Sequence, residues 1–293
     1  MTFSPFNTET HAKWILAGEH AVLRGHAALV FPNTKKTLTL TYTPTNYAVE
    51  TSFAGSEIAK LQQPLLTVLN YSYTLFAGKL PPITGHFHIT NNIPLGAGMG
   101  ASAALCVAIA RWFHHQFPHL NINTSQLGQK FEDLFHGKSS GLDIAGAAAE
   151  TGLYFLQGIT TPIQQIWSPI WALSFSGQMG KTATCIQHVQ QLWQKNHTLA
   201  ASIDLDMAKS VAQAHDALTH TQSLQQLTDA IKLGMRCFEN WGLITPTLQE
   251  HMNYLTNAGA IATKPTGSGG GGYVLSLWDK SPINVSGLIL QES

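Results

Sequence analysis

The amino-acid sequence predicts an α+β protein built from two domains. Segments in which apolar and polar residues alternate, as in half-buried strands, are concentrated in its first half. Residues 203–257 instead carry apolar residues at helical spacing. A chain of 293 residues with 44% hydrophobic content can bury a large core, so both halves are expected to be folded.

The charge balance argues against nucleic acid and membranes as partners. Lysine plus arginine number 16 and aspartate plus glutamate also number 16, so no long-range basic field attracts polyanions. Three widely spaced cysteines favour free thiols in a reducing compartment. Because neither a leader peptide nor an apolar stretch of spanning length is recognisable, we expect a cytoplasmic protein.

The first elements follow from alternation and turn residues. Residues 12–30 predict a strand, a turn around Gly18 to Gly25 and a second strand, and residues 37–43 predict another strand that Pro44 ends. A short helix is expected over 58–69. Residues 85–90 predict a strand that leads directly into a glycine-rich turn.

That turn, Asn92–Cys106, is the most informative stretch of the chain. Gly96, Gly98 and Gly100 alternate and are followed at once by an apolar helix reaching about Phe113. Free N–H groups at such a helix start attract an anion, for which a phosphate is suited. The alternative is an ordinary strand-to-helix turn with Ser102 as a helix cap.

Two acidic residues follow in small-residue surroundings. A helix beginning near Ser125 carries Glu132 toward the interior, and a turn then leads into an alanine-rich helix with Asp143 in its first turn. Gly137-Lys-Ser does not form a P-loop, because Glu132 stands where the first glycine is needed and no apolar strand precedes it.

The second half is more helical. Strands are predicted over 152–156 and 171–175, an amphipathic helix after 176–182, and three helices within 203–257. Residues 264–278 form a glycine loop that enters an apolar strand, which favours a ligand-facing loop over a flexible linker. The second domain is expected to begin between residues 155 and 180.

Three segments resemble, in order, the three motifs of the GHMP small-molecule kinases. They are Glu19-His-Ala-Val-Leu-Arg-Gly25, Pro94-Leu-Gly-Ala-Gly-Met-Gly-Ala-Ser-Ala-Ala104 and Thr266-Gly-Ser-Gly-Gly-Gly-Gly272. Within that superfamily the resemblance is closest to the mevalonate kinases. It implies a two-domain fold, with a ribosomal-protein-S5-like ATP-binding domain over 1–165 and a helix-and-sheet domain over 166–293.

The resemblance also implies an activity, the ATP- and Mg²⁺-dependent phosphorylation of the primary hydroxyl of mevalonate in isoprenoid biosynthesis. Asp143, in Ser140-Gly-Leu-Asp143, matches the catalytic carboxylate, and Lys13 matches the lysine that pairs with it. Ser102 and Glu132 match the magnesium-binding residues. Phosphoryl transfer requires these types, because it depends on an aligned acceptor and on neutralised charge.

The remaining implied contacts concern the nucleotide and the acceptor. The phosphate loop is implied to use Pro94, Gly96, Ala97, Gly98, Gly100, Ala101, Ser102 and Ala103. Ala101 replaces a commoner serine, which removes one phosphate hydrogen bond. The small-molecule substrate is implied to contact Glu19, His20, Thr182, Gly267 and Ser268. A homodimer is left open.

Each residue also has a simpler interpretation. Glu132 could be a solvated helix residue, Asp143 a helix N-cap and Lys13 an edge-strand charge, and only the whole set together favours catalysis. The histidines at 114, 115 and 119 are interpreted as solvated surface. The alternative functions are a phosphomevalonate kinase with Lys138 as an extra cation, another GHMP small-molecule kinase, and an inactive small-molecule sensor.

Overall fold

The computed structural model describes residues 3–56, 60–76 and 79–291 and divides into two compact units. The first unit contains residues up to Lys13, 32–95 and 100–150, and the second contains 14–31, 96–99 and the chain from Thr151 onward. The units therefore interleave along the chain. The consecutive domains 1–165 and 166–293 remain a prediction.

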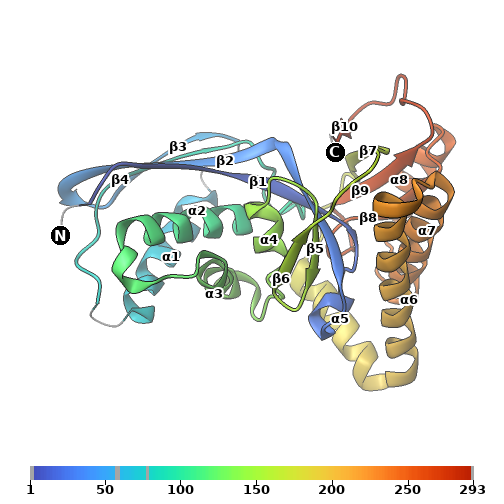
Figure 1. Cartoon of the computed structure of the whole chain (residues 1–293), viewed down its shortest axis with the longest axis horizontal. Helices are drawn as coiled ribbons and strands as arrows, with labels where there is room; N and C mark the ends of the chain where they lie inside the picture. The colour runs from blue at the N-terminus through green and yellow to red at the C-terminus, as the bar shows by residue number, and fades with distance from the viewer. Residues whose placement is uncertain (1–2, 57–59, 77–78, 292–293) are drawn as a thin grey trace. The chain divides into compact units, whose positions relative to one another are not determined.

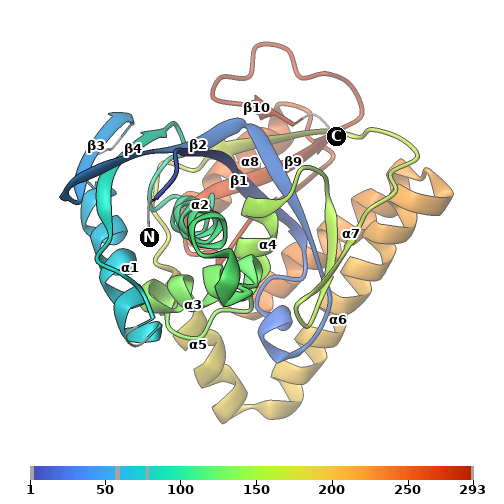
Figure 2. The ribbon, with the colours of Figure 1, turned by 60° about the vertical axis from the view of Figure 1, so that its left-hand side comes forward.

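The first unit is a sheet covered by helices on one face. Strand β4 (Thr84–Asn91) pairs antiparallel with β2 (Ala28–Ala48) and parallel with β3 (Glu50–Gly55). Helices α1 (Gln62–Leu75), α2 (Ala101–Gln116) and α3 (Thr124–His136) lie beneath it (Figures 1 and 2). The ring of Trp112 on α2 lies 5.1 Å from the rings of both Tyr42 and Phe87, so the aromatic residues join helix and sheet.

The long strand β2 corrects one prediction, because Pro44 does not end it. The strand continues to Ala48, and its register with β4 slips between Thr43, opposite His86, and Ala48, opposite Thr84. Proline lacks an N–H group and is tolerated where the hydrogen-bond ladder is interrupted in this way. The irregularity therefore accommodates Pro44 within the strand.

Strand β1 (Phe6–Ala17) begins six residues before the predicted start at Ala12. Its first half alternates between exposed and partly buried positions, and the buried Thr10 donates to the carbonyl oxygens of Leu38 and Ala104. The helix predicted over 58–69 is α1, which begins at Gln62; residues 57–59 lie outside the described part of the chain.

The second unit has its own sheet, in the order β10-β7-β9-β8. The strands are β7 (Ile170–Phe175), β8 (Ala262–Pro265), β9 (Tyr273–Trp278) and β10 (Ile289–Leu290). Strands β5 (Leu153–Leu156) and β6 (Ile159–Pro162) form a hairpin that continues from the start of β2.

Four helices complete this unit. They are α5 (Thr182–Lys195), α6 (His197–Asp216), α7 (Leu224–Asn240) and α8 (Pro246–Asn257). Leu248, Met252 and Leu255 on α8 recur at helical spacing and pack against Val274 and Trp278 of β9. The predicted helical region is confirmed, although α6 begins six residues before 203. Within the described residues, no helix is both long and apolar enough to cross a bilayer.

Candidate functional site

Lys13 and Asp143 form an ion pair within the first unit. Lys13 lies near the middle of β1, and Asp143 lies in the first turn of the short helix α4 (Leu142–Ala148). Lys13 Nζ is 3.0 Å from Asp143 Oδ1, and the side chains are 3% and 41% exposed, respectively. Lys13 is therefore a buried cation and not a solvated charge, and it pairs with a carboxylate that solvent or a ligand can reach.

Ser102 and Glu132 form a second polar pair in the same unit. Ser102 Oγ, in the first turn of α2, donates to Glu132 Oε1 on α3 at 3.0 Å. Glu132 is only 2% exposed, so it is not a solvated helix residue. The hydroxyl of Ser102 is directed to this carboxyl group, and the N-cap position of α2 is Gly100.

The electrostatics link these two pairs. Burial raises the pKa of Glu132 to about 7, and the negative charge of Asp143 acts in the same direction. Hydrogen bonds from Ser102 and Cys106 and the charge of Lys13 oppose the shift. A buried carboxyl group that titrates near neutrality next to a hydroxyl group is a hard-oxygen donor set, in which a divalent cation can replace the proton.

That donor set is small. The described residues contain no group of three or more His, Cys, Asp or Glu side chains able to hold a metal ion. Mg²⁺ keeps several waters and is bound by one or two protein oxygens together with substrate phosphates. Ser102 and Glu132 therefore fit Mg²⁺ brought with a nucleotide better than a permanently bound metal.

The glycine loop before α2 exposes its backbone. Gly96 and Gly98 have φ of 73° and 84° and are exposed, whereas the intervening Ala97 is buried. Gly100 has φ of 77° and is the N-cap of α2, where it has no side chain to cap the helix. The start of a 16-residue helix that follows exposed glycines fits the predicted anion site.

Gly100 also makes room for the lysine of the ion pair. A Cβ atom at this position would lie 2.8 Å from Lys13 Cγ, which is closer than real Cβ atoms come to a neighbour. Of the other predicted loop residues, Pro94 is partly buried, and Ala101 and Ala103 are buried in the first turn of α2. Gly100 is therefore required both by its positive φ and by the close approach of Lys13.

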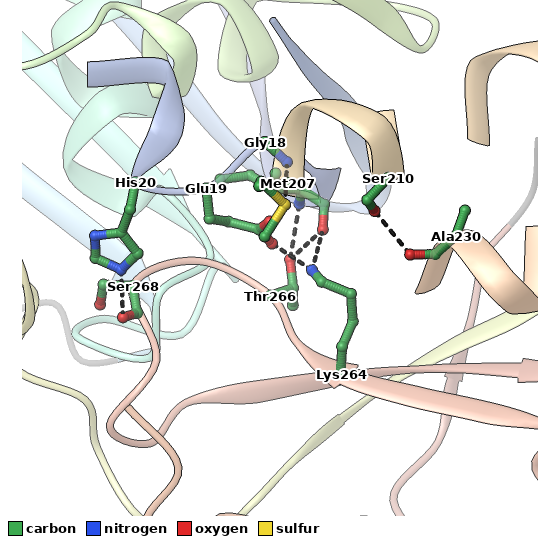
Figure 3. A network of polar contacts seen from close by, with 10 residues as sticks. Gly18, Glu19, His20, Met207, Ser210, Ala230, Lys264, Thr266 and Ser268 are labelled. Atoms are coloured by element: carbon green, nitrogen blue, oxygen red, sulfur yellow. Dashed lines mark hydrogen bonds and ion pairs between the residues drawn. The ribbon is translucent and has the colours of Figure 1, made fainter. Parts of the chain in front are cut away.

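The predicted substrate residues lie in the second unit. Glu19 pairs with Lys264, and His20 Nε2 is 2.9 Å from the carbonyl oxygen of Ser268 (Figure 3). Ser268 Oγ donates to Thr182 Oγ1 at 3.3 Å, and Gly267 precedes it in the same loop. The first and third motifs thus contact each other, while their contacts with a substrate remain a prediction.

Burial determines the charge of His20. It lowers the pKa of this imidazole to about 4, and the charge of Arg24 adds to the effect, while the Ser268 carbonyl and Asp204 oppose it. His20 is therefore neutral at pH 7. Because a carbonyl can only accept, Nε2 carries the proton and Nδ1 is the acceptor nitrogen.

Two ion pairs were not predicted from the sequence. Lys264, which precedes the predicted glycine loop, is fully buried against Glu19. Arg24, which is partly buried, donates from Nη2 to Oδ1 of the buried Asp204 on α6 at 2.7 Å. A lysine that is fully buried needs a counter-charge, but the sequence does not show that Lys264 is buried.

The histidines near the end of α2 agree with their prediction. His114, His115 and His119 are exposed. His115 Nε2 lies 3.0 Å from Ser4 Oγ, and His114 Nδ1 lies 3.0 Å from the carbonyl oxygen of Ile122. Lys138, the extra cation of the phosphomevalonate kinase alternative, is also exposed.

Part of the first unit is similar in sequence to known proteins. Residues 67–151, which include the glycine loop, Glu132 and Asp143, match the family model described as the GHMP kinases N terminal domain. The mevalonate kinase of Pyrococcus horikoshii is 32% identical over 197 residues, covering 64% of this chain. The match spans 58% of the length of that relative.

Other similarities extend over more of the chain. The mevalonate kinase of Methanothermobacter thermautotrophicus is 24% identical over 90% of this chain and 88% of its own. The structure of Leishmania major mevalonate kinase in complex with R-mevalonate superposes with a TM-score of 0.78 at 21% identity, over 96% of this chain and 91% of that one.

A phosphomevalonate kinase from Streptococcus pneumoniae shares the same fold, with a TM-score of 0.71 at 15% identity over 94% of this chain and 92% of its own. The predicted two-domain α+β fold is thus confirmed along nearly the whole chain. Residues 67–151 thus match the GHMP kinases N terminal domain, and the chain is similar in sequence to the mevalonate kinase of Pyrococcus horikoshii over part of its length.

Proposed function

We propose that this chain is a kinase that transfers the γ-phosphoryl group of ATP to the primary hydroxyl of mevalonate, giving 5-phosphomevalonate for isoprenoid biosynthesis. The observation that carries the proposal is the ion pair between the buried Lys13 and the accessible Asp143 at 3.0 Å. It joins a carboxylate that can accept a proton to a cation beside it. Relatives named mevalonate kinase, 24–32% identical, support the choice of acceptor.

Asp143 is proposed as the acceptor of the hydroxyl proton. Its side chain is 41% exposed, so an alcohol can approach it, whereas Lys13 is held beneath it at 3% exposure. Lys13 adds positive charge near the attacking oxygen. A carboxylate can serve as the proton acceptor here, because proton transfer comes late in a loose transition state.

Ser102 and Glu132 are proposed to hold Mg²⁺ together with the nucleotide phosphates. Their oxygens are the donors that Mg²⁺ prefers, and the pKa of Glu132 near 7 means that a cation competes with a single proton there. When bound, Mg²⁺ supplies charge neutralisation on the transferring phosphoryl group. The N-terminus of α2 and the exposed backbone of Gly96 and Gly98 are proposed to bind the phosphates of ATP.

The acceptor is proposed to be recognised by Glu19, His20, Thr182, Gly267 and Ser268. Neutral His20 offers Nδ1 as a hydrogen-bond acceptor, since Nε2 donates to Ser268. Glu19 and Thr182 add oxygen acceptors, which suit an alcohol that carries hydroxyl groups. Removing any one of these groups should raise the KM of the acceptor more than that of ATP.

Phosphorylation itself can be tested directly. Purified chain, ATP and mevalonate should give ADP and a phosphomonoester on the primary carbon, detected by ³¹P NMR, and the reaction should stop when Mg²⁺ is chelated. The Asp143→Asn variant serves as the matched control for contaminating kinases. Absence of ADP formation with mevalonate would reject this function.

A further inference from the structure

The third glycine motif is preceded by a lysine that is buried without contact with solvent. Lys264, in β8, is 0% exposed, and its ammonium group pairs with the carboxylate of Glu19, which is 2% exposed (Figure 3). Nζ also lies 3.4 Å from the carbonyl oxygen of Ile15. Glu19 belongs to the first motif, whereas Lys264 lies two residues before the third and has no role in the set derived from the motifs.

The surroundings of Lys264 form a slot shaped for a lysine side chain. Its ammonium group lies 5.3 Å from the centre of the Phe238 ring on α7, which is cation–π distance. One helical turn earlier, Gly234 also faces the lysine stem: a Cβ atom there would lie 3.2 Å from Ser210 Oγ and 3.4 Å from Lys264 Cε.

Stability does not explain the pair. A buried ion pair must offset the desolvation of two charges, and apolar residues of similar volume are often as stabilising or more so. Ionic groups retained in a core are better explained by the geometry that they fix. Here the fixed element is the Gly18–His20 turn at the end of β1.

Three residues of the segment 264–268 contact this turn and the strand end before it, and Met207 Sδ accepts from the N–H group of Gly18 at 3.2 Å. Lys264 binds Glu19, the hydroxyl of Thr266 bonds both the N–H group and the carbonyl of Ile15, and the carbonyl of Ser268 accepts from His20. His20 needs such support, because its φ of 57° is unfavourable for a residue with a side chain. Strained backbone persists only when its surroundings determine it.

We propose that Lys264 is a positioning residue, which holds the Glu19 carboxylate in one orientation so that the Glu19–His20 turn binds the alcohol acceptor. This inference rests on the proposed function, because it assigns the turn to acceptor binding. Lys264 acts through Glu19 and does not touch the substrate. Its removal therefore affects the acceptor and leaves ATP binding intact.

The test compares four forms of the full chain: wild type, Lys264→Met, Glu19→Gln and the double variant. Lys264→Met should raise the KM of mevalonate by about tenfold or more, the loss typical of removing a residue that orients a ligand-binding group, with the KM of ATP changed less than about twofold. The double variant should match Glu19→Gln alone, because Lys264 then has nothing left to position. Ser210→Ala is the control. Ser210 is buried nearby, donates at 2.7 Å to the carbonyl of Ala230 (Figure 3) and should not affect the KM of the acceptor.

The possible outcomes separate cleanly. A folded Lys264→Met with the mevalonate KM of wild type, or with equal increases for ATP and mevalonate, would overturn the positioning role while leaving the kinase function intact. If Lys264→Met does not fold, the double variant is compared with Glu19→Gln instead, because the double variant buries no unpaired charge. A mevalonate KM of the double variant above that of Glu19→Gln would overturn the inference. A wild-type chain without turnover of mevalonate signals failure of the proposed function. In that case, urea unfolding of the four forms tests the pair alone, and additive free energies of unfolding would contradict a coupled pair.

Discussion

Asp143 shows how this chain produces a functional carboxylate from few charges. Its side chain is 41% exposed and would be an ordinary surface group without the buried Lys13 at 3.0 Å. Glu132, on the neighbouring helix, is the opposite case, a buried carboxyl group with a pKa of about 7. The two carboxyl groups thus suit different roles, proton acceptance and cation binding, because their burial differs.

Asp143→Asn should keep the fold and the ability to bind ATP while losing turnover by about 10²–10⁴-fold, the usual contribution of a general base. The change removes the charge and retains the volume. Steady-state turnover, combined with the rise in melting temperature caused by Mg²⁺-ATP, separates the two effects. Near-normal turnover would exclude Asp143 as the base.

Ser102→Ala and Glu132→Gln should each raise the Mg²⁺ concentration that gives half-maximal rate. Each variant removes a hard oxygen donor or its negative charge from the pair joined at 3.0 Å. Rates measured across a Mg²⁺ titration at fixed ATP test this expectation. Unchanged magnesium dependence in both variants would mean that other groups hold the metal.

His20 should make the wild-type chain sensitive to acid. In the folded chain the pKa of His20 is about 4, below its ordinary value of 6.5. Between these two pH values the imidazole is therefore protonated in the unfolded chain and neutral in the folded chain. The resulting stability is fully present above pH 6.5 and is lost as pH falls toward 4, by about 3 kcal/mol at pH 4. His20→Gln, which does not titrate, should lose less stability in urea unfolding between pH 7 and 4, and an equal loss would contradict the burial of a neutral His20.

At the scale of elements, the start of α2 combines three requirements in a few residues. Gly100 supplies the left-handed backbone and the space for Lys13, while Ser102 is directed at Glu132. Because Gly100 has no side chain, the N-cap residue does not cap the first turn of the helix. One helix end therefore connects the anion site, the ion pair and the cation site.

Gly100→Ala should reduce both stability and turnover, because the added Cβ atom would lie 2.8 Å from Lys13 Cγ. Gly158→Ala is the matched control: its φ of 84° is similar, but nothing lies within 4 Å of the position that the added methyl group would take. Both variants lose about 1–2 kcal/mol from the left-handed backbone. Only Gly100→Ala should also lose turnover, and equal turnover in the two would show that the close approach to Lys13 does not matter.

Helices and strands were predicted well where apolar residues recur with a clear period. They were predicted poorly where the structure depends on pairing with another strand. Strand β4 and helix α3 agree closely with prediction, since their apolar residues alternate or recur at helical spacing. Strand β6 is exposed throughout and has no such pattern; it forms because it pairs with β5. The extension of β2 past Pro44 likewise depends on a register slip that no local signal indicates.

At the scale of the whole molecule, order along the chain and order in space differ. The two units interleave, so that residues 14–31 and 96–99 group with the C-terminal half. Three motifs in order predicted the resemblance to the GHMP kinases, which in turn implied the pairing of Lys13 with Asp143 that the structure has at 3.0 Å. The pairing of Lys264 with Glu19 could not be predicted from the sequence, because 245 residues separate them and no pattern in either segment indicates the other residue.

The proposed activity is tested most directly by the choice of acceptor. In a coupled assay at saturating Mg²⁺ and ATP, kcat/KM should be substantially higher for mevalonate than for phosphomevalonate, because a hydroxyl acceptor needs Asp143 whereas a phosphate acceptor needs additional cations. The one extra cation near Asp143 in the sequence, Lys138, is exposed. A preference for phosphomevalonate that collapses in Lys138→Ala would contradict this account and assign Lys138 to the phosphate of the acceptor.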